Sequence, residues 1–187
     1  VLFIKTYDKL LSEKSFREVF YDIFIPFIQE IGYLWQTNTI SIAHEHFISY
    51  LIKQKLLINT EKLQIQEPTK HDKVFVLYLP DNEVHELGVM YLNYEIQFNG
   101  YKTIYLGESV PIGSLKDVKK YFDNIVYVSY MTVEPNKSVV NDYVKEVKKE
   151  LLTDNSEFWA IGRMVESIDK KLCSDTILTF TSIKNLI

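Results

Sequence analysis

The second part of the sequence alternates strictly between short apolar runs and helix-length segments. A short apolar run that is bounded by turn residues is typical of a strand buried on both faces. The apolar runs lie at 74–79, 102–106, 125–128, 158–161 and 176–178. Strict alternation of strand and helix predicts a parallel sheet with helices on both faces and right-handed crossovers. We therefore expect a Rossmann-like (flavodoxin-like) domain with a five-stranded parallel sheet over residues 74–187.

Residues 1–66 have the spacing of helices instead. The apolar side chains of the first long helix recur every three or four residues, and they are Phe16, Phe20, Ile23, Phe27 and Ile31. Ser15 or Ser12 is a suitable N-cap, and Pro26 predicts a kink rather than a break. A second helix is expected over 40–63, with its bundle-facing side chains at Ala43, Phe47, Tyr50, Leu51 and Leu57. We expect a small helical bundle over 1–66, with the polar residues 67–73 as a linker.

Charge, cysteine content and hydropathy exclude several classes of protein. The 187 residues include 21 basic and 25 acidic side chains, so the net charge is −4. That balance argues against nucleic-acid binding by charge alone. The single cysteine cannot form an internal disulfide, and no apolar run approaches the roughly 20 residues of a membrane helix. A cytoplasmic protein without a membrane segment is the expectation.

The residues after the first expected strand carry a candidate metal ligand. Glu83, His85 and Gly88 form a Glu-x-His-x-x-Gly pattern at the sheet edge where doubly wound folds bind ligands. A carboxylate two residues from a histidine can hydrogen-bond one ring nitrogen and orient the other toward a metal. Gly88 removes side-chain bulk, so a flat group can lie close to the backbone. A histidine at the start of a helix is more often a cap or a solvated residue, so this motif does not decide the function alone.

Three further residues extend the motif. Forty residues separate Gly88 from Ser129, Gly107 ends the second expected strand, and Gly162 follows the fourth. Together with Glu83 and His85, this pattern resembles the signature of the cobalamin-binding fold. The resemblance implies that His85 is the lower cobalt ligand and that Glu83 orients it.

The resemblance also implies a slot for the displaced nucleotide tail of the cofactor. Its lining residues would be Gly88, Gly107, Ser129 and Gly162. The family signature has a Gly-Gly pair where this chain reads Ile161-Gly162-Arg163. A side chain beside Gly162 is expected to narrow the slot. Tyr130, next to Ser129, is also within reach of a ligand there.

The helical part adds a second pattern. Nine residues separate Trp35 from the pair Glu45 and His46, which is similar to the helical cap of CarH/LitR-type light-sensing MerR regulators. The resemblance implies that Trp35 covers the upper axial group of adenosylcobalamin and that Glu45 contacts the adenosyl group. His46 would be an upper cobalt ligand after light breaks the cobalt–carbon bond. The alternative for each residue alone is bundle core for Trp35 and a surface pair for Glu45 and His46.

The resemblance predicts a cobalamin-binding sensor module of a MerR-type transcriptional regulator, with no enzymatic activity of its own. Cofactor, and in light-sensing relatives light, would control self-association as a dimer or tetramer. DNA would be bound only through a helix-turn-helix domain that this chain lacks. Two alternatives stay open. One is a corrinoid carrier subunit of a methyltransferase, which needs His85 but not Trp35 or His46. The other is a relative that has lost cobalamin and serves as an oligomerisation or small-ligand domain, which the single glycine at Gly162 favours.

Overall fold

A computed structural model describes residues 2–152 and 155–185. The chain divides into two compact units, residues 1–59 and 60–187. The division falls inside helix α4 (Ile42–Gln64) rather than in the polar segment 67–73. Each unit is described by itself below. No helix among the described residues is both long enough and apolar enough to cross a membrane.

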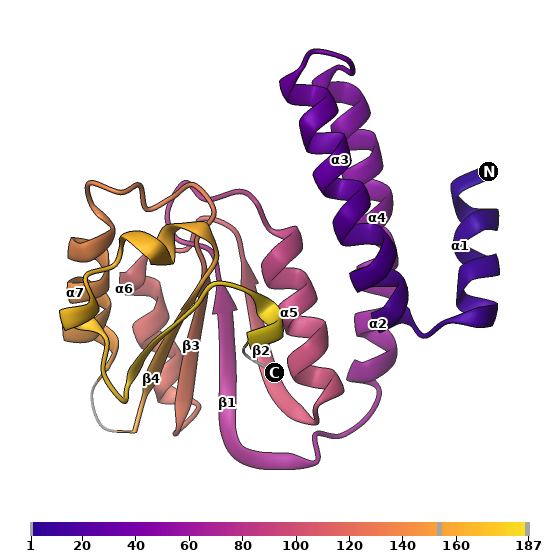
Figure 1. Ribbon diagram of the computed structural model, residues 1–187. Coiled ribbons are helices and arrows are strands. Elements are labelled where there is room, and N and C mark those ends of the chain that lie inside the picture. Colours follow the sequence, from indigo (N-terminus) through magenta and orange to yellow (C-terminus); the bar gives the residue numbers. More distant parts are fainter. Residues whose placement is uncertain (1, 153–154, 186–187) are drawn as a thin grey trace. The chain divides into compact units, whose positions relative to one another are not determined.

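The first unit is helical, as expected (Figure 1). Its elements are α1 (Leu2–Glu13), α2 (Phe16–Val19), the π-helical turn η1 (Phe20–Phe24), α3 (Ile25–Gln36) and most of α4. Ser15 caps α2 in a capping box, because its hydroxyl accepts from the Glu18 backbone N–H while the Glu18 carboxylate accepts from the Ser15 N–H. Pro26 lies in the first turn of α3, where a missing N–H costs little, and the wide turn η1 precedes it.

Aromatic rings form much of the core of this unit. Tyr7 of α1 stacks on Phe24, and its hydroxyl accepts a hydrogen bond of 2.8 Å from Asn59 of α4. On α4, Ile52 and Leu56 are fully buried. The face predicted for this helix was wrong, since Phe47, Tyr50 and Leu57 are exposed and Ala43 is too. Apolar side chains surround α4 on nearly all sides, so their spacing does not select one face.

The second unit contains the expected five-stranded sheet, and every neighbouring pair of strands is parallel. The strand order is β2-β1-β3-β4-β5. The strands are β1 (Lys70–Tyr78), β2 (Tyr101–Gly107), β3 (Ile125–Tyr130), β4 (Glu157–Ile161) and β5 (Ile177–Phe180). The helical segments are α5 (Leu87–Phe98), α6 (Ile112–Leu115), η2 (Lys116–Lys120), α7 (Val140–Leu151), η3 (Arg163–Ser167), η4 (Lys170–Leu172) and η5 (Ile183–Asn185).

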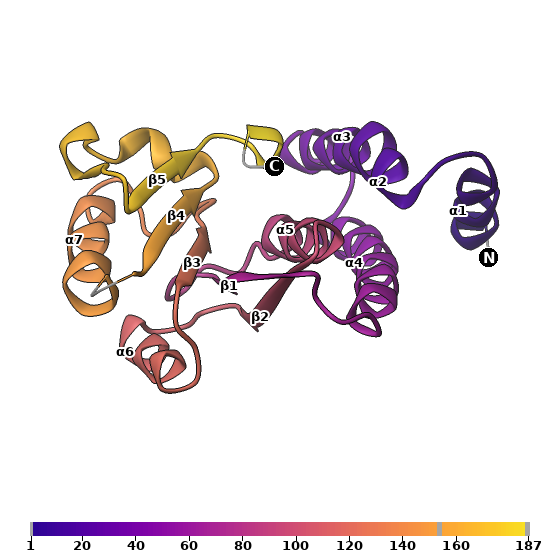
Figure 2. The same ribbon diagram turned by 90° about the horizontal axis from the view of Figure 1, so that it is seen from below.

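Helices cover both faces of the sheet, as Figure 2 shows for α5 on one face and for α6 and α7 on the other. A buried cluster from β1, β3 and β4 packs against apolar side chains of α6 and α7. The chain leaves β1 toward β2 on one side and returns to β3 on the other. The carboxyl ends of β1 and β3 therefore form the topological switch point, where folds of this type bind ligands.

Several boundaries differ from the predicted ones. β1 begins at Lys70, inside the segment 67–73 that was expected to be a linker. α5 begins at Leu87, so His85 lies in the preceding loop rather than in the helix. α7 begins at Val140, after a turn in which the Asn136 side chain accepts from the Ser138 N–H and hydroxyl.

Candidate functional site

His85 lies at the switch point with one ring nitrogen held and the ring exposed. Its Nδ1 is 2.6 Å from Oε1 of Glu83, so the hydrogen bond expected from the sequence is present. The Glu83 side chain is only 1% exposed, whereas that of His85 is 56% exposed. Since a carboxylate can only accept, Nδ1 carries the proton, and the neutral imidazole keeps a lone pair on Nε2. This arrangement suits a histidine that binds one metal ion from one side.

Glu83 also binds the loop that follows β3. Its Oε2 accepts hydrogen bonds from three successive backbone N–H groups, those of Thr132, Val133 and Glu134, at 2.6–3.0 Å. Its Oε1 accepts from the N–H of Val84 and of His85 as well as from the imidazole. One carboxylate therefore joins the histidine loop after β1 to the loop after β3.

These bonds decide the ionisation of Glu83. Burial alone would raise the pKa of this carboxyl group. The hydrogen bonds from Val133, Glu134 and His85 outweigh burial and lower the pKa to about 2. Glu83 is thus a buried anion with all its charge-stabilising partners in place.

Gly88 is the second residue of α5, and the ring of Tyr130 lies directly against it. A Cβ atom at Gly88 would lie 2.5 Å from Cζ of Tyr130 and 2.8 Å from both Cε atoms. The flat group expected to approach this glycine is therefore a side chain of the protein itself. Burial raises the pKa of the Tyr130 hydroxyl, so the ring stays neutral.

Ser129 points to the opposite face of the sheet, toward α7. Its Oγ is buried and makes no hydrogen bond of ordinary geometry with a described residue. The hydroxyls of Tyr78 and Tyr143 lie nearby, 3.0 Å from each other, and Ser129 lowers the pKa of both. Burial is the larger effect and raises the pKa of both tyrosines above the ordinary value.

Gly107 is the last residue of β2 and Gly162 follows β4, but their surroundings differ. Both have positive φ, +82° and +104°. A Cβ atom at Gly107 would meet only Tyr105, at the ordinary distance of 3.9 Å, whereas one at Gly162 would lie 2.6 Å from the Met131 carbonyl oxygen. Gly162 is therefore packed against the protein backbone, while Gly107 has open space.

The residues predicted in the helical unit lie on two helices. Trp35, near the end of α3, is 44% exposed. Glu45 and His46 lie in the first turns of α4, where Oε2 of Glu45 is 2.7 Å from Nδ1 of His46. Oε1 of Glu45 accepts from the Ser49 hydroxyl at 2.6 Å. The His46 side chain is 72% exposed, and its Nε2 is the nitrogen that this contact leaves available.

Three features of the site were not predicted from the sequence. They are the hydroxyl pair of Tyr78 and Tyr143, the packing of Tyr130 on Gly88, and the amides of the loop 132–134. Tyr78 and Ser129 are register partners on neighbouring strands, so their side chains share a face. Strand register could have paired these two residues. The backbone N–H groups of residues 132–134 could not be predicted, because no side chain in the sequence marks them as hydrogen-bond donors to Glu83.

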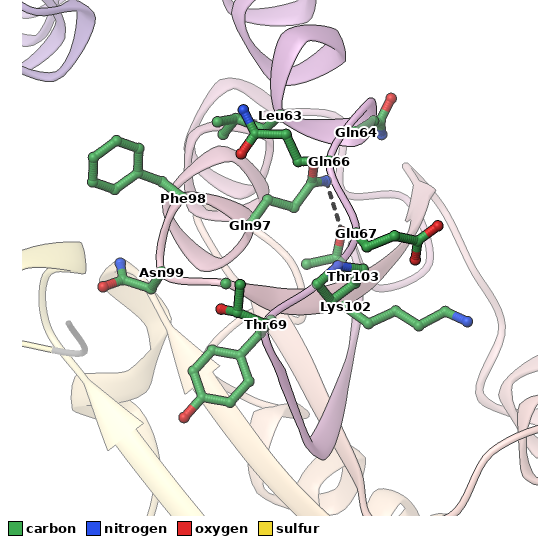
Figure 3. Close-up of a pocket in the computed structure, with 13 residues that line it drawn as sticks. Leu63, Gln64, Gln66, Glu67, Thr69, Gln97, Phe98, Asn99, Lys102 and Thr103 are labelled. Carbon is green, nitrogen blue, oxygen red and sulfur yellow. Dashed lines mark hydrogen bonds between the residues drawn. The ribbon is translucent and has the colours of Figure 1, made fainter.

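A separate pocket of about 490 Å³ lies at the opposite, amino-terminal edge of the sheet (Figure 3). It is lined by the end of α5, the start of β2 and the segment that leads into β1. In it Gln97 donates to the Thr103 hydroxyl at 2.7 Å, and the charged lining residues are Glu67 and Lys102. Its described lining contains no histidine or cysteine.

Comparison with known proteins supports the resemblance seen in the sequence. Residues 2–58 match the family model described as "B12 binding domain". The chain is 24% identical over 108 residues to the HTH-type transcriptional repressor CarH of Myxococcus xanthus. The aligned region covers 58% of this chain and 35% of that protein. These two matches support a region similar to the cobalamin-binding part of CarH. The chain thus spans about a third of the length of that curated relative.

The fold is shared with corrinoid proteins. The monomethylamine corrinoid protein of Methanosarcina barkeri superposes with a TM-score of 0.65 at 13% identity, covering 84% of this chain and 74% of that one. A cobalamin-binding protein of Desulfitobacterium hafniense gives a TM-score of 0.49 at 15% identity, covering 83% of this chain and 72% of that one. The first likeness confirms the predicted fold class, a helical part with a Rossmann-like five-stranded sheet.

The site fits one part of a cobalamin and not another. An exposed, oriented imidazole at His85 fits a cobalt ligand. The spaces beside Gly88 and Gly162 are filled by the protein's own atoms, so they form no slot for a tail. Among the residues that the structure describes, no three histidine, cysteine or acidic side chains gather to hold a metal ion. A zinc site made by protein ligands alone therefore has no candidate there.

Proposed function

We propose that this chain is the cobalamin-binding sensor region of a MerR-type transcriptional regulator. The observation that carries the proposal is His85, whose Nδ1 is fixed by the buried anion Glu83 while the rest of the ring faces solvent at the switch point. Glu83 holds the tautomer that leaves Nε2 free to bind cobalt. Bound cobalamin supplies a cobalt centre whose upper ligand can be exchanged.

The helical unit supports adenosylcobalamin as the form of the cofactor. Trp35 is a large apolar side chain that is exposed, and Glu45 and His46 form a hydrogen-bonded pair on α4. In the proposed role Trp35 would cover the bound cofactor, Glu45 would contact its adenosyl part, and His46 would be available as a cobalt ligand once the adenosyl group has left.

Regulation in this proposal works through assembly. The chain itself is acidic, with a net charge of −4, so DNA binding belongs to a helix-turn-helix domain outside it. A ligand that binds one assembly more tightly than another shifts the population toward that assembly. Adenosylcobalamin bound in the dark therefore favours a dimer or tetramer, and light reverses it. The chain has no catalytic role of its own and acts in the cytoplasm.

The test is titration of the purified chain with adenosylcobalamin in the dark, followed by absorbance and by size-exclusion chromatography. We expect a spectrum of bound, histidine-ligated corrinoid and an earlier elution volume. His85→Ala should remove the histidine-ligated spectrum, while His71→Ala, at an exposed position near the start of β1, should keep it. If the wild-type chain leaves the cofactor free at micromolar concentration, the proposal is wrong.

A corrinoid carrier subunit needs the same histidine, so a second readout separates it from a sensor. A sensor requires Trp35, Glu45 and His46 for the response to the adenosyl group. Trp35→Ala should therefore abolish the dark change in elution volume while His85 still ligates cobalt. Binding of methylcobalamin and adenosylcobalamin with no change of assembly in either case would favour the carrier instead.

A further inference from the structure

The ring of Tyr130 occupies the space that a glycine at position 88 would otherwise leave open. Tyr130 is the last residue of β3 and lies on the α5 face of the sheet. The Cβ position of Gly88 is closer to the tip of this ring than real Cβ atoms approach other atoms. Because residue 88 is a glycine, the Tyr130 ring can pack directly against α5. The packed ring fills the space between α5 and β3.

The other face of the same strand end is closed as well. The hydroxyls of Tyr78 and Tyr143 meet beside the buried Oγ of Ser129. The Met131 carbonyl covers Gly162 at the end of β4. A group entering the sheet edge beside His85 must displace one of these side chains, and the backbone at Gly162 cannot yield easily.

Charge at this edge also disfavours an anionic tail. The lower nucleotide of a cobalamin carries a phosphate. The loops 79–86 and 107–111 contain Asp81, Glu86 and Glu108 together with the buried Glu83 and no lysine or arginine, whereas the loops after β3 and β4 contribute Lys137 and Arg163 to the same edge. Burial raises the pKa of Tyr105, and the negative charges of Glu86 and Glu108 raise it further. A phosphate placed beside the loops after β1 and β2 would therefore meet negative rather than positive charge.

We propose that Tyr130 is a specificity-determining residue that fills the tail slot, so the site prefers a corrinoid without a lower nucleotide over complete cobalamin. This inference rests on the proposed function, because it assumes that His85 binds the cobalt of a corrinoid. The ring takes the place of the nucleotide tail against Gly88. Complete cobalamin binds only by moving the ring out or by leaving its tail outside the slot.

The experiment compares hydroxocobalamin with aquohydroxocobinamide, which lacks the nucleotide, in the wild-type chain and in variants. Dissociation constants come from absorbance titration and from calorimetry. The cofactor's own base competes with His85 in cobalamin but is absent from cobinamide, and this effect is the same in every variant. A difference in the ratio of the two dissociation constants between the wild type and a variant therefore reports only how well the slot accepts the nucleotide tail.

We expect Tyr130→Ala to shift the ratio toward cobalamin by about ten- to a hundred-fold, the factor that burial of one aromatic side chain gives. Tyr130→Phe keeps the ring and should leave the ratio unchanged. Tyr121→Ala, a matched loss of an exposed tyrosine, should also leave it unchanged. If Tyr130→Ala does not fold by circular dichroism, Tyr130→Leu shortens the side chain while it stays apolar, and it should shift the ratio in the same direction.

The outcomes separate the two ideas. If neither corrinoid binds the folded wild-type chain, the proposed function is wrong. If both bind through His85 and the ratio is the same in the wild type, Tyr130→Ala and Tyr130→Leu, the function stands and the role of Tyr130 is refuted.

Discussion

Replacing Glu83 by glutamine tests whether one carboxylate holds the histidine loop and the loop after β3 together. The amide side chain of a glutamine has one acceptor oxygen, so either the imidazole or the backbone N–H groups of residues 132–134 lose an anionic partner. The lowering of the Glu83 pKa from 4.5 to about 2 corresponds to about 3 kcal/mol, at about 1.4 kcal/mol per pH unit. We expect Glu83→Gln to lower the free energy of unfolding by about 2–3 kcal/mol at pH 7.

The sign of the pH dependence follows from the direction of the shift. Because the folded-state pKa is lowered, the stabilisation is fully present above the ordinary pKa of 4.5 and is lost as the pH falls toward about 2. The difference in free energy between wild type and variant should therefore shrink by roughly 2 kcal/mol between pH 7 and pH 3.

Urea unfolding followed by Trp159 fluorescence, in a Trp35→Phe background, reports the second unit alone. Glu108→Gln, at an exposed carboxylate in the loop after β2, is the control and should change the free energy of unfolding by about 0.5 kcal/mol or less. If Glu83→Gln changes the free energy of unfolding by no more than this, or if its effect is independent of pH, the Glu83 carboxylate does not hold the two loops together.

Two further substitutions test local features of each unit. Ser15→Ala removes the capping box with Glu18 and should lower the free energy of unfolding by about 1 kcal/mol in thermal unfolding followed by circular dichroism, whereas Ser15→Asp should retain most of it. Gly162→Ala places a Cβ at φ +104° and 2.6 Å from the Met131 carbonyl oxygen, so it should cost at least about 2 kcal/mol. Gly32→Ala, where nothing lies within 4 Å, is its matched control, and equal stabilities of the two variants would contradict the strain argument.

The fold was accessible from the sequence because its signal is repeated. Each of the five apolar runs became a strand, and the parallel arrangement followed from the helical segments between them. The face of α4 was not accessible, since Phe47 and Ile52 are equally apolar and only packing distinguishes them. Likewise, the start of β1 at Lys70 depends on pairing with Tyr101 rather than on local hydropathy.

The site was predicted in its chemistry and missed in its packing. The spacing of Glu83 and His85 fixed their hydrogen bond, because two residues in one tight loop have few ways to meet. The resemblance implied an open slot beside Gly88, whereas the ring of Tyr130, the residue after Ser129, packs against this glycine. A glycine in the sequence indicates space for another group, but which group packs there is determined by the tertiary structure.

The most direct test of the account is the absorbance spectrum of the purified chain mixed with cobalamin in the dark, for the wild type and for His85→Ala. If His85 binds the cobalt, the wild type should show a bound, histidine-ligated corrinoid and the variant should lose that ligation. A wild-type spectrum identical to that of free cofactor, or a histidine-ligated spectrum that survives His85→Ala, would contradict it.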